Sequence, residues 1–498
     1  MHRRHFLQAT AVGTVSTLAA LQTASAQMMR GMTSAGMGGM MGQSPTTGPN
    51  WPTGLPLRRL GVLENTSLSA GEFEGTLVAS RYLASLVPGR TTELWGYNNA
   101  SPGPVIELRE GQRVTIGFAN RLGLDSTIHW HGLPVPADQD GSPMEPVAPG
   151  ADRLYTFDVP IGSAGTYWYH PHAHQTTTLQ VGHGLAAPLI VRSVDDPLGI
   201  LPEVNLMITS LALDQNGQVA TGSTAMAGMG MMMTTGAGEL LVNGQKTPLH
   251  TVAPGATQRW RIINATADRY LRLALDGHRF TVVGTDGGLL TEPLSGLTEW
   301  LLAPAQRVEI VVMIAAGQSA RYMLRDLGYT GGIGGVAGGQ LLSVETDGAV
   351  PQAPIELPAV LRLVADLGPA TTRQLVVLSA TGMGMMGTFL INGRVFDMNR
   401  VDLETVVGRV ELWDLVNTTM MDHPIHIHGT QFQVVGRTVR GVVVPAAYPA
   451  WFDTVNVPAG ETITIKTRQM LPGKRMIHCH ILPHEDAGMM AVLDVTLA

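Results

Sequence analysis

The chain has 498 residues, a formal net charge of −7 and few charged side chains, 14% of the total. A chain of this length exceeds what one hydrophobic core normally organises, so about three domains are expected. The negative charge argues against a nucleic-acid partner, and the abundant glycine and proline favour an all-β protein with many turns.

The N-terminus has the features of an export signal. Arg3-Arg4 precedes an apolar stretch from Ala9 to Leu21, and Ala24-Ser25-Ala26 supplies a small-residue cleavage site. The apolar stretch is too short to span a bilayer, so no stable membrane anchor is expected. Paired arginines favour the twin-arginine route, with an ordinary Sec signal as the alternative. We therefore expect an export signal over residues 1–26, a Met/Gly-rich linker over 27–53, and a periplasmic or otherwise exported protein.

One sequence pattern then occurs three times, at intervals of about 150 residues, the size of one β-sandwich domain. Each copy has a turn glycine, a strand of β-favouring residues, and an asparagine nine positions after the glycine. The three pairs are Gly111 and Asn120, Gly255 and Asn264, and Gly408 and Asn417. We therefore expect three related sandwiches near 54–195, 196–350 and 351–498, with the proline-rich segment 351–358 as the last linker.

The repeat also locates candidate metal ligands. Nine residues after the asparagine, the first and third copies carry His-x-His, where the second copy has Leu273-Ala274-Leu275. A second His-x-His follows five residues after Gly165 and Gly473, whereas Gly317 of the second copy is followed by Tyr322-Met323-Leu324. The eight histidines are His129, His131, His170, His172, His426, His428, His478 and His480. A metal cluster is therefore expected between the first and third domains, with the second domain as a spacer.

The spacing of these pairs has a physical reason. Residues i and i+2 of a strand point to the same face, so each pair aims two imidazoles at one place. Imidazole binds copper, zinc, iron and nickel, and eight imidazoles are too many for one ion but fit three coppers. A single His-x-His pair is more often a polar strand face, so the argument depends on the four pairs together.

Cys479, the only cysteine, lies between two of these histidines and must face the other way along the strand. A thiolate with two histidines and a weak axial methionine is the ligand set of a blue copper site. The other members are available in His423, in His484 five residues after the cysteine, and in Met489 ten residues after it. The Cys-His backbone link would then join the two copper sites by a short covalent route.

The four motifs that contain these residues are HWHG, WYHPHAH, HPIHIHG and HCHILPHEDAGMM. Together they resemble the copper signatures of the multicopper oxidases: laccases, bilirubin oxidases and bacterial copper-efflux oxidases. The resemblance covers nearly all of the mature chain and implies three consecutive cupredoxin-like Greek-key β-sandwich domains, four copper ions and reduction of O2 to water. It assigns type 1 copper to His423, Cys479, His484 and Met489, type 2 to His129 and His426, and the type 3 pair to His131, His170, His172, His428, His478 and His480.

Reducing O2 to two waters also takes four protons, for which a carboxylate near the cluster is the expected source. Glu485 in the last motif and Asp140 after the first match acidic positions that look functional in the family. The alternative for both is a loop carboxylate that is hydrogen-bonded to the backbone.

The chain has 26 methionines, and their distribution suggests what the reductant is. Many lie in Met-Gly runs without core periodicity, and thioether sulfur prefers Cu(I); the alternative is a flexible loop with methionine as filler. The segment 391–399 and Met420-Met421 resemble the cuprous oxidases, whose carboxylate at this place is replaced here by Thr419. Candidate Cu(I) ligands are Met383, Met386, Met420, Met421 and Asp422.

The sequence therefore predicts a monomeric oxidase of Cu(I), phenols or both, with a role in copper tolerance. A laccase that acts mainly on phenols or aromatic amines is the alternative enzyme. A non-enzymatic envelope protein is a third reading, but relatives of that kind lack the copper ligands that this chain retains. Copper storage by the methionine clusters would leave the four His-x-His pairs unexplained.

Overall fold

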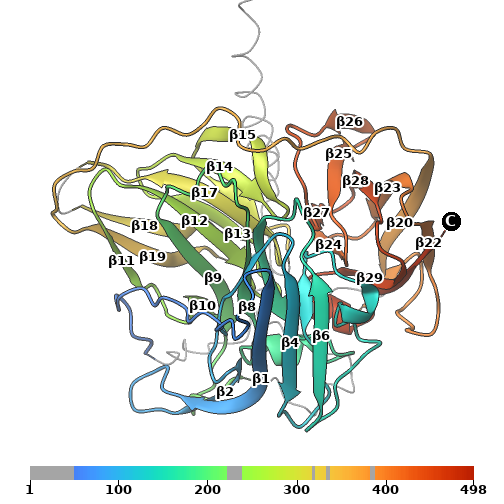
Figure 1. The fold of residues 1–498 in the computed structure, drawn as a ribbon, viewed down its shortest axis with the longest axis horizontal. Coiled ribbons are helices and arrows are strands. Elements are labelled where there is room, and N and C mark those ends of the chain that lie inside the picture. The colour runs from blue at the N-terminus through green and yellow to red at the C-terminus, as the bar shows by residue number, and fades with distance from the viewer. Residues whose placement is uncertain (1–49, 221–237, 317–319, 333–336, 382–386, 498) are drawn as a thin grey trace, which may run out of the picture. The chain divides into compact units, whose positions relative to one another are not determined.

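A computed structural model of the chain describes residues 50–220, 238–316, 320–332, 337–381 and 387–497 (Figure 1). The expected export signal, almost all of the linker, Met383 and Met386 lie outside these residues. Within them nearly all regular structure is β-strand, so the all-β prediction is confirmed. Among the described residues no helix has the length and apolar character needed to cross a membrane.

The described strands form three successive groups. The first contains β1 (Glu72–Ala84), β2 (Thr92–Tyr97), β3 (Ile106–Arg109), β4 (Arg113–Asn120), β5 (His129–His131), β6 (Asp152–Asp158), β7 (Gly165–His170) and β8 (Ala187–Arg192). The second contains β9 (Glu203–Leu211), β10 (Glu239–Val242), β11 (Leu249–Val252), β12 (Thr257–Asn264), β13 (Leu271–Leu275), β14 (Phe280–Thr285), β15 (Gly288–Leu297), β16 (Trp300–Leu302), β17 (Arg307–Met313), β18 (Arg321–Asp326) and β19 (Gly339–Thr346). The third contains β20 (Thr372–Thr381), β21 (Thr388–Ile391), β22 (Leu403–Val406), β23 (Val410–Asn417), β24 (His423–Ile427), β25 (Phe432–Val439), β26 (Val442–Pro445), β27 (Thr454–Val457), β28 (Thr462–Arg468), β29 (Gly473–Cys479) and β30 (Met490–Thr496). Short helices are η1 (Ala137–Gln139), α2 (Thr177–Gly182) and α3 (Leu482–Asp486).

The second and third groups share one topology, and the first has the same central strands with fewer outer ones. One sheet of each group has the order β2-β1-β4-β6, β10-β9-β12-β17-β14-β15 or β21-β20-β23-β28-β25-β26. The other has the order β3-β8-β7-β5, β11-β19-β18-β13-β16 or β22-β30-β29-β24-β27. Strands at equivalent places pair in the same sense: β1 with β4, β9 with β12 and β20 with β23 are all parallel. The prediction of three consecutive Greek-key sandwiches is confirmed, while the exact domain boundaries stay a prediction.

The repeated asparagine has the same structural role in each copy. It ends β4, β12 or β23, and its side-chain amide donates to two backbone carbonyls, one in the loop that follows and one 27 to 40 residues further along the chain. The six donor–acceptor distances lie between 2.8 and 2.9 Å. Since each loop leads directly into the next strand of the opposite sheet, these bonds fix where β5, β13 and β24 begin.

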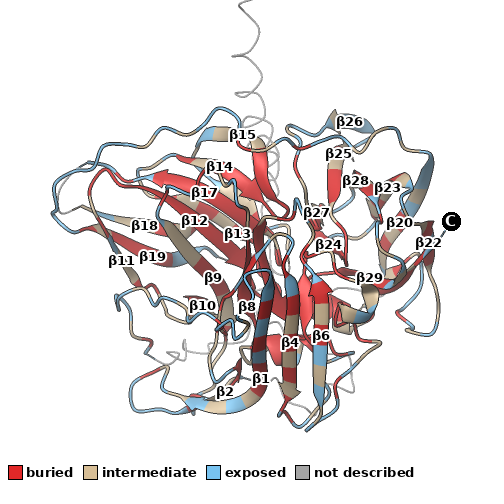
Figure 2. Ribbon diagram, in the orientation of Figure 1, coloured by how far each residue is buried: buried red, intermediate tan, exposed pale blue. Residues whose placement is uncertain are grey.

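Each pair of sheets encloses its own apolar core. Side chains of β4 and β8 meet in the first, those of β12 and β13 in the second, and those of β23 and β24 in the third. Burial alternates along β4 and β23, as expected for strands with one face turned to solvent. In contrast, all of β12 and most of β17 are buried on both faces (Figure 2), so the second group is covered by its neighbours.

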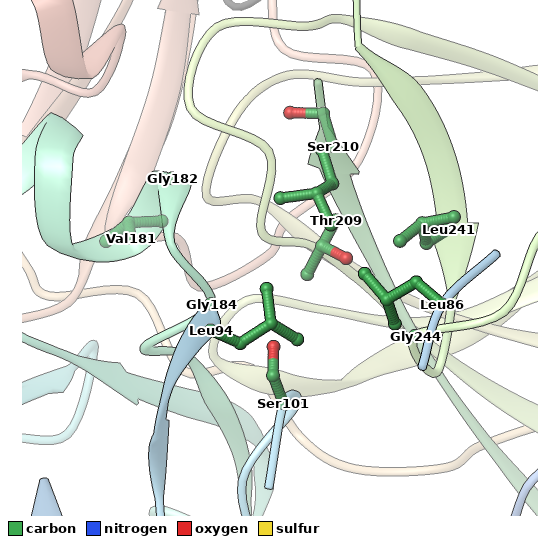
Figure 3. Close-up of a pocket in the computed structure, with 11 residues that line it drawn as sticks. Leu86, Leu94, Ser101, Val181, Gly182, Gly184, Thr209, Ser210, Leu241 and Gly244 are labelled. Carbon is green, nitrogen blue, oxygen red and sulfur yellow. The ribbon is translucent and has the colours of Figure 1, made fainter. Parts of the chain in front are cut away.

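A cavity lies between the first and second groups, where Leu86, Leu94, Val181 and Leu241 face one another (Figure 3). Its volume of ≈ 20 Å³ has room for about one water molecule, and none of its lining residues is titratable. It is too small and too inert to be a substrate site.

Candidate metal centre

Four strands bring the eight predicted histidines together. β5 carries the first pair of the first domain, and β24 carries His426 and ends one residue before His428; β7 and β29 each end within the second pair. Antiparallel register places His129 beside His170 and His426 beside His478. All eight side chains are buried, and rings of the first and third groups meet across the interface. The structure thus gathers these eight predicted residues at one place.

One pair spans the two domains. His129 Nδ1 lies 3.0 Å from the carbonyl oxygen of Asp140, and His426 Nδ1 lies 2.9 Å from that of Asp453. Because a carbonyl only accepts, each Nδ1 must carry the proton, so each Nε2 presents a lone pair. The two Nε2 atoms are 3.3 Å apart. Two facing lone pairs repel unless a cation lies between them, so this pair fits one metal ion.

A second set of histidines also has its Nδ1 atoms on acceptors and its Nε2 atoms close together. His428 Nδ1 is 2.7 Å from a carboxylate oxygen of Asp140, and His478 Nδ1 is 3.1 Å from the carbonyl oxygen of Cys479. Their Nε2 atoms are therefore unprotonated, yet they lie 3.0 Å apart, and His172 Nε2 is 3.1 Å from that of His478. These three nitrogens converge and fit a second ion.

The remaining three histidines form a third set. Among the described residues, His131 Nδ1, His170 Nε2 and both nitrogens of His480 are buried without a hydrogen-bond partner. The three ring centroids lie 4.9 to 5.7 Å apart. Buried polar atoms without partners are rare and need an explanation, which a third metal ion supplies.

Burial makes all three sets suitable ligands. It lowers the pKa of His172 and His478 to about 3 and that of His426 to about 4. These three imidazoles are therefore neutral at ordinary pH, which is the form that binds metal. Six of the remaining predicted ligands show the same direction of shift.

Cys479 lies on the opposite face of the strand, within the apolar core of the third domain. Its sulfur is 3.4 Å from His423 Nδ1 and 3.7 Å from His484 Nδ1. Met489 is fully buried in the same cluster. Burial raises the pKa of the Cys479 thiol, so without a bound cation it would be protonated and inert. The donor set fits a soft metal such as copper.

The two histidines beside Cys479 have defined outer contacts. Phe389 stacks on His484, with ring centroids 3.9 Å apart and planes at 21°. His423 Nε2 lies 2.8 Å from the hydroxyl oxygen of Thr419. Since Nδ1 of His423 faces the sulfur, Nε2 is the protonated nitrogen and donates to Thr419. Both contacts restrain the rings on the side away from the sulfur.

The two predicted proton carriers also lie beside the histidines. The Asp140 carboxylate contacts His428, and Glu485 lies 3.6 Å from His172 Nδ1 and 3.1 Å from His478 Nδ1. Burial raises the pKa of Glu485. Burial would also raise that of Asp140, but the neighbouring His428 and His129 lower it well below its usual range. Glu485 therefore tends to hold a proton where Asp140 stays ionised.

The predicted substrate ligands are only partly favoured by the structure. Met420 is fully exposed and Met421 is half-buried against the cysteine core. Asp422 is buried and fully engaged: it accepts from the Tyr329 hydroxyl, the Asn456 amide and a backbone N–H. A carboxylate with these partners is not free to bind a metal substrate, so Asp422 is better explained as part of the fold.

Phe389, Asp453 and Arg307 were not among the residues predicted from the sequence. Asp453 is fully buried, 3.0 Å from His131 Nε2, and is paired with Arg307 of the second domain. An aspartate within the otherwise apolar run Trp451-Phe452 was a usable signal for a buried carboxylate. The second domain thus contacts a carboxylate that lies beside the cluster, while its expected role as a spacer stays a prediction.

Comparison with known proteins agrees with this site. Sequence models of the family described as multicopper oxidase match residues 81–196, 211–339 and 369–497. The chain is 30% identical to a multicopper oxidase of Staphylococcus aureus, covering 87% of this chain and 91% of that one. It is 29% identical to a laccase of Bacillus subtilis, covering 81% and 90%. A solved multicopper oxidase from Campylobacter jejuni, described as a metallo-oxidase, is 36% identical and superposes with a TM-score of 0.82, covering 90% and 96%. The chain therefore belongs to the multicopper oxidase family and is an oxidoreductase that uses O2.

Proposed function

We propose that this oxidase holds four copper ions at two places and accepts electrons from Cu(I), from phenols, or from both. His423, Cys479, His484 and Met489 would hold the type 1 ion. His129 and His426 would hold the type 2 ion, with His172, His428 and His478 on one type 3 ion and His131, His170 and His480 on the other. The facing lone pairs of His129 and His426, 3.3 Å apart, are the observation that carries this proposal.

When bound, copper supplies one-electron redox chemistry, by which four single electrons from the reductant reach O2. The protein contributes the connection between the two places. Cys479 belongs to the type 1 site, and its chain neighbours His478 and His480 belong to the two type 3 sets. The short covalent path between them lies within a buried strand, away from water.

The protein also controls protons at the cluster. Glu485 is buried between His172 and His478, and its raised pKa keeps the carboxyl protonated where an exposed glutamate would not be. Glu485 would therefore be a source of protons for the reduction of O2 beside these two histidines. Asp140 stays ionised and accepts from His428, which orients that ring.

The reductant is proposed to act at the outer side of the type 1 site, near Thr419 and the exposed Met420. A thioether at the surface favours Cu(I), and the Campylobacter jejuni relative is described as a metallo-oxidase. The Bacillus subtilis relative is named a laccase, which favours phenols. We further propose that the chain is exported, through its twin-arginine-like N-terminus, and contributes to copper tolerance.

The test is steady-state O2 uptake by the purified, copper-loaded protein with Cu(I), Fe(II) or a phenol as reductant. We expect four coppers per chain, a blue colour, and uptake with Cu(I), a phenol or both. Stimulation of phenol oxidation by added Cu(II) would favour Cu(I) as an intermediate carrier, whereas indifference would favour a plain laccase. Absence of uptake with every reductant would refute the oxidase function.

A further inference from the structure

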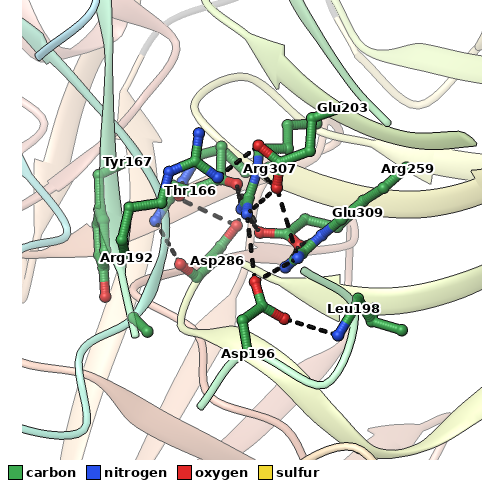
Figure 4. A network of polar contacts seen from close by, with 12 residues as sticks. Thr166, Tyr167, Arg192, Asp196, Leu198, Glu203, Arg259, Asp286, Arg307 and Glu309 are labelled. Carbon is green, nitrogen blue, oxygen red and sulfur yellow. Dashed lines mark hydrogen bonds and ion pairs between the residues drawn. The ribbon is translucent and has the colours of Figure 1, made fainter. Parts of the chain in front are cut away.

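A buried ion pair links the second domain to the metal centre. Arg307, the first residue of β17, has no exposed side-chain surface. Figure 4 shows it with Thr166 of the first domain and Asp286 of the second, and it also pairs with Asp453 of the third. Its five N–H groups all have acceptors: the carbonyl oxygens of Thr166, Ala305 and Asp286, and both carboxylate oxygens of Asp453. An arginine with every donor satisfied in a two-pronged pair has one orientation.

Asp453 passes this restraint to a metal ligand. Its Oδ1 atom lies 2.8 Å from Arg307 Nη1 and 3.0 Å from His131 Nε2, and it also accepts from the Thr454 hydroxyl. Its backbone carbonyl accepts from His426 Nδ1 at 2.9 Å. One residue thus contacts the outer nitrogens of a histidine from the first domain and of one from the third.

The contact decides which nitrogen of His131 can bind metal. A carboxylate only accepts hydrogen bonds, so the proton of the neutral ring must lie on Nε2. Nδ1 then keeps its lone pair, and this atom is buried without a hydrogen-bond partner. Most of the other cluster histidines show the reverse pattern, with Nδ1 on an acceptor.

The backbone beside His131 is shaped around the same ion pair. Gly132 has a φ of +86°, and a Cβ there would lie 2.2 Å from Asp453 Oδ2 and 2.7 Å from Arg307 Nη2. Any side chain at this position would displace the pair. The glycine of the HWHG motif therefore has a spatial reason in addition to its conformational one.

We propose that Arg307 is a positioning residue for the three-copper cluster. It fixes the Asp453 carboxylate so that this carboxylate holds His131 with Nδ1 toward the metal. The second domain, which supplies none of the predicted ligands, thereby sets the ligand geometry of the other two. This inference rests on the proposed copper occupancy of the eight-histidine cluster.

A purely structural ion pair is the competing explanation, and the chain offers a matched control. Arg259 on the neighbouring strand β12 is also buried, 2% exposed, and pairs with the buried Glu309 and with Asp196 (Figure 4). Among the described residues, these two carboxylates are bonded to arginines and to Thr166 or the loop backbone, and to no cluster histidine. Losing either arginine should affect stability, but only loss of Arg307 should affect the metal centre.

The experiment compares Arg307→Lys with Arg259→Lys. Lysine keeps the charge but cannot form the two-pronged pair or fill the three carbonyl contacts. For R307K we expect the affinity of the cluster for copper to fall by about 10- to 100-fold, the range for residues that orient ligands. The electron paramagnetic resonance spectrum of the non-blue copper should change, while the blue absorption stays. R259K should keep the wild-type copper content and spectrum.

The proposed role of Arg307 can be refuted by several results. Identical copper content and spectra in R307K and wild type would overturn the proposal, as would equal changes in R307K and R259K. If R307K does not fold, Asp453→Asn replaces it, since asparagine keeps the shape but weakens the acceptor; an unchanged spectrum there overturns the proposal too. Copper content and spectra are measured without turnover. A wild type that binds copper at the cluster but consumes no O2 would refute the oxidase function alone.

Discussion

The second and third domains have the same strand order but different kinds of side chain at equivalent positions. β24 and β29 of the third domain carry metal-binding candidates, whereas β13 and β18 of the second present core residues such as Leu273 and Leu324. Both arrangements form a closed apolar core. The same strand arrangement therefore accommodates either core residues or metal-binding candidates at these positions.

The two domains also differ at their other sheet, where the second domain is the more buried and carries buried arginine side chains. β23 of the third domain alternates buried and half-buried residues, while its equivalent β12 is buried throughout. Arg259 and Arg261 on β12 meet Glu309 on β17, so charged side chains occupy positions that face outward in β23. The second domain thus lacks the predicted ligands and has buried ion pairs at this sheet, where Glu309 also accepts from Thr166 of the first domain.

The largest expected effect follows from removing the residue that joins the two copper places. Cys479→Ser should abolish the blue colour and lower O2 uptake by at least about 10³-fold, because a hydroxyl does not replace a thiolate on copper. Copper content should fall by one ion per chain, with the eight-histidine cluster retained. A variant that stays blue would contradict the assignment of Cys479.

Glu485→Gln should slow reoxidation by O2 about 100-fold, since a neutral amide cannot donate the proton. The blue colour should remain, because Cys479 is untouched. In the wild type the raised pKa of Glu485 keeps the proton on at low pH, so turnover should fall as pH rises through that pKa. The variant should lack this decline. Glu404→Gln, at an exposed position of β22, is the control and should behave as wild type.

Leu273→Ala tests whether core packing really replaces the missing ligands in the second domain. Leu273 is buried at the position equivalent to a histidine of β24, so truncation should destabilise the protein by about 2–5 kcal/mol in denaturant unfolding. Copper content and O2 uptake should not change below the transition. Leu375→Ala, on an exposed position of β20, should have little effect on either quantity. A loss of cluster copper in L273A would contradict a purely packing role.

Much of this comparison was predictable from the sequence, because it depends on local spacing. The Gly-to-Asn repeat located equivalent strands, and alternation along a strand placed Cys479 and its neighbouring histidines on opposite faces. Contacts between residues far apart in the chain were not predictable. Arg307 and Asp453 are 146 positions apart, and the strand pattern around Arg259 is equally typical of an exposed face. Asp422 looked available for substrate until its three partners were known.

The smallest expected effect comes from a threonine that both domains share. Thr419 and Thr266 each follow the repeated asparagine by two residues, and each hydroxyl donates within the same turn, 2.7 to 2.8 Å from the asparagine Oδ1. Only Thr419 also accepts from a histidine, His423. Thr→Val at either position should therefore lower stability by about 1 kcal/mol, the contribution of a typical hydrogen bond.

The variants Thr419→Val and Thr266→Val should differ in the properties of the type 1 copper site. Removing the acceptor from His423 Nε2 makes the imidazole a weaker donor to the metal, which disfavours Cu(II) relative to Cu(I). Thr419→Val should therefore raise the reduction potential of the type 1 site and shift its blue absorption, while Thr266→Val leaves both unchanged. Equal potentials in the two variants would mean that the Thr419 contact belongs to the turn alone. A raised potential in T419V alone would show that the same turn acquired its electronic role from the histidine beside it.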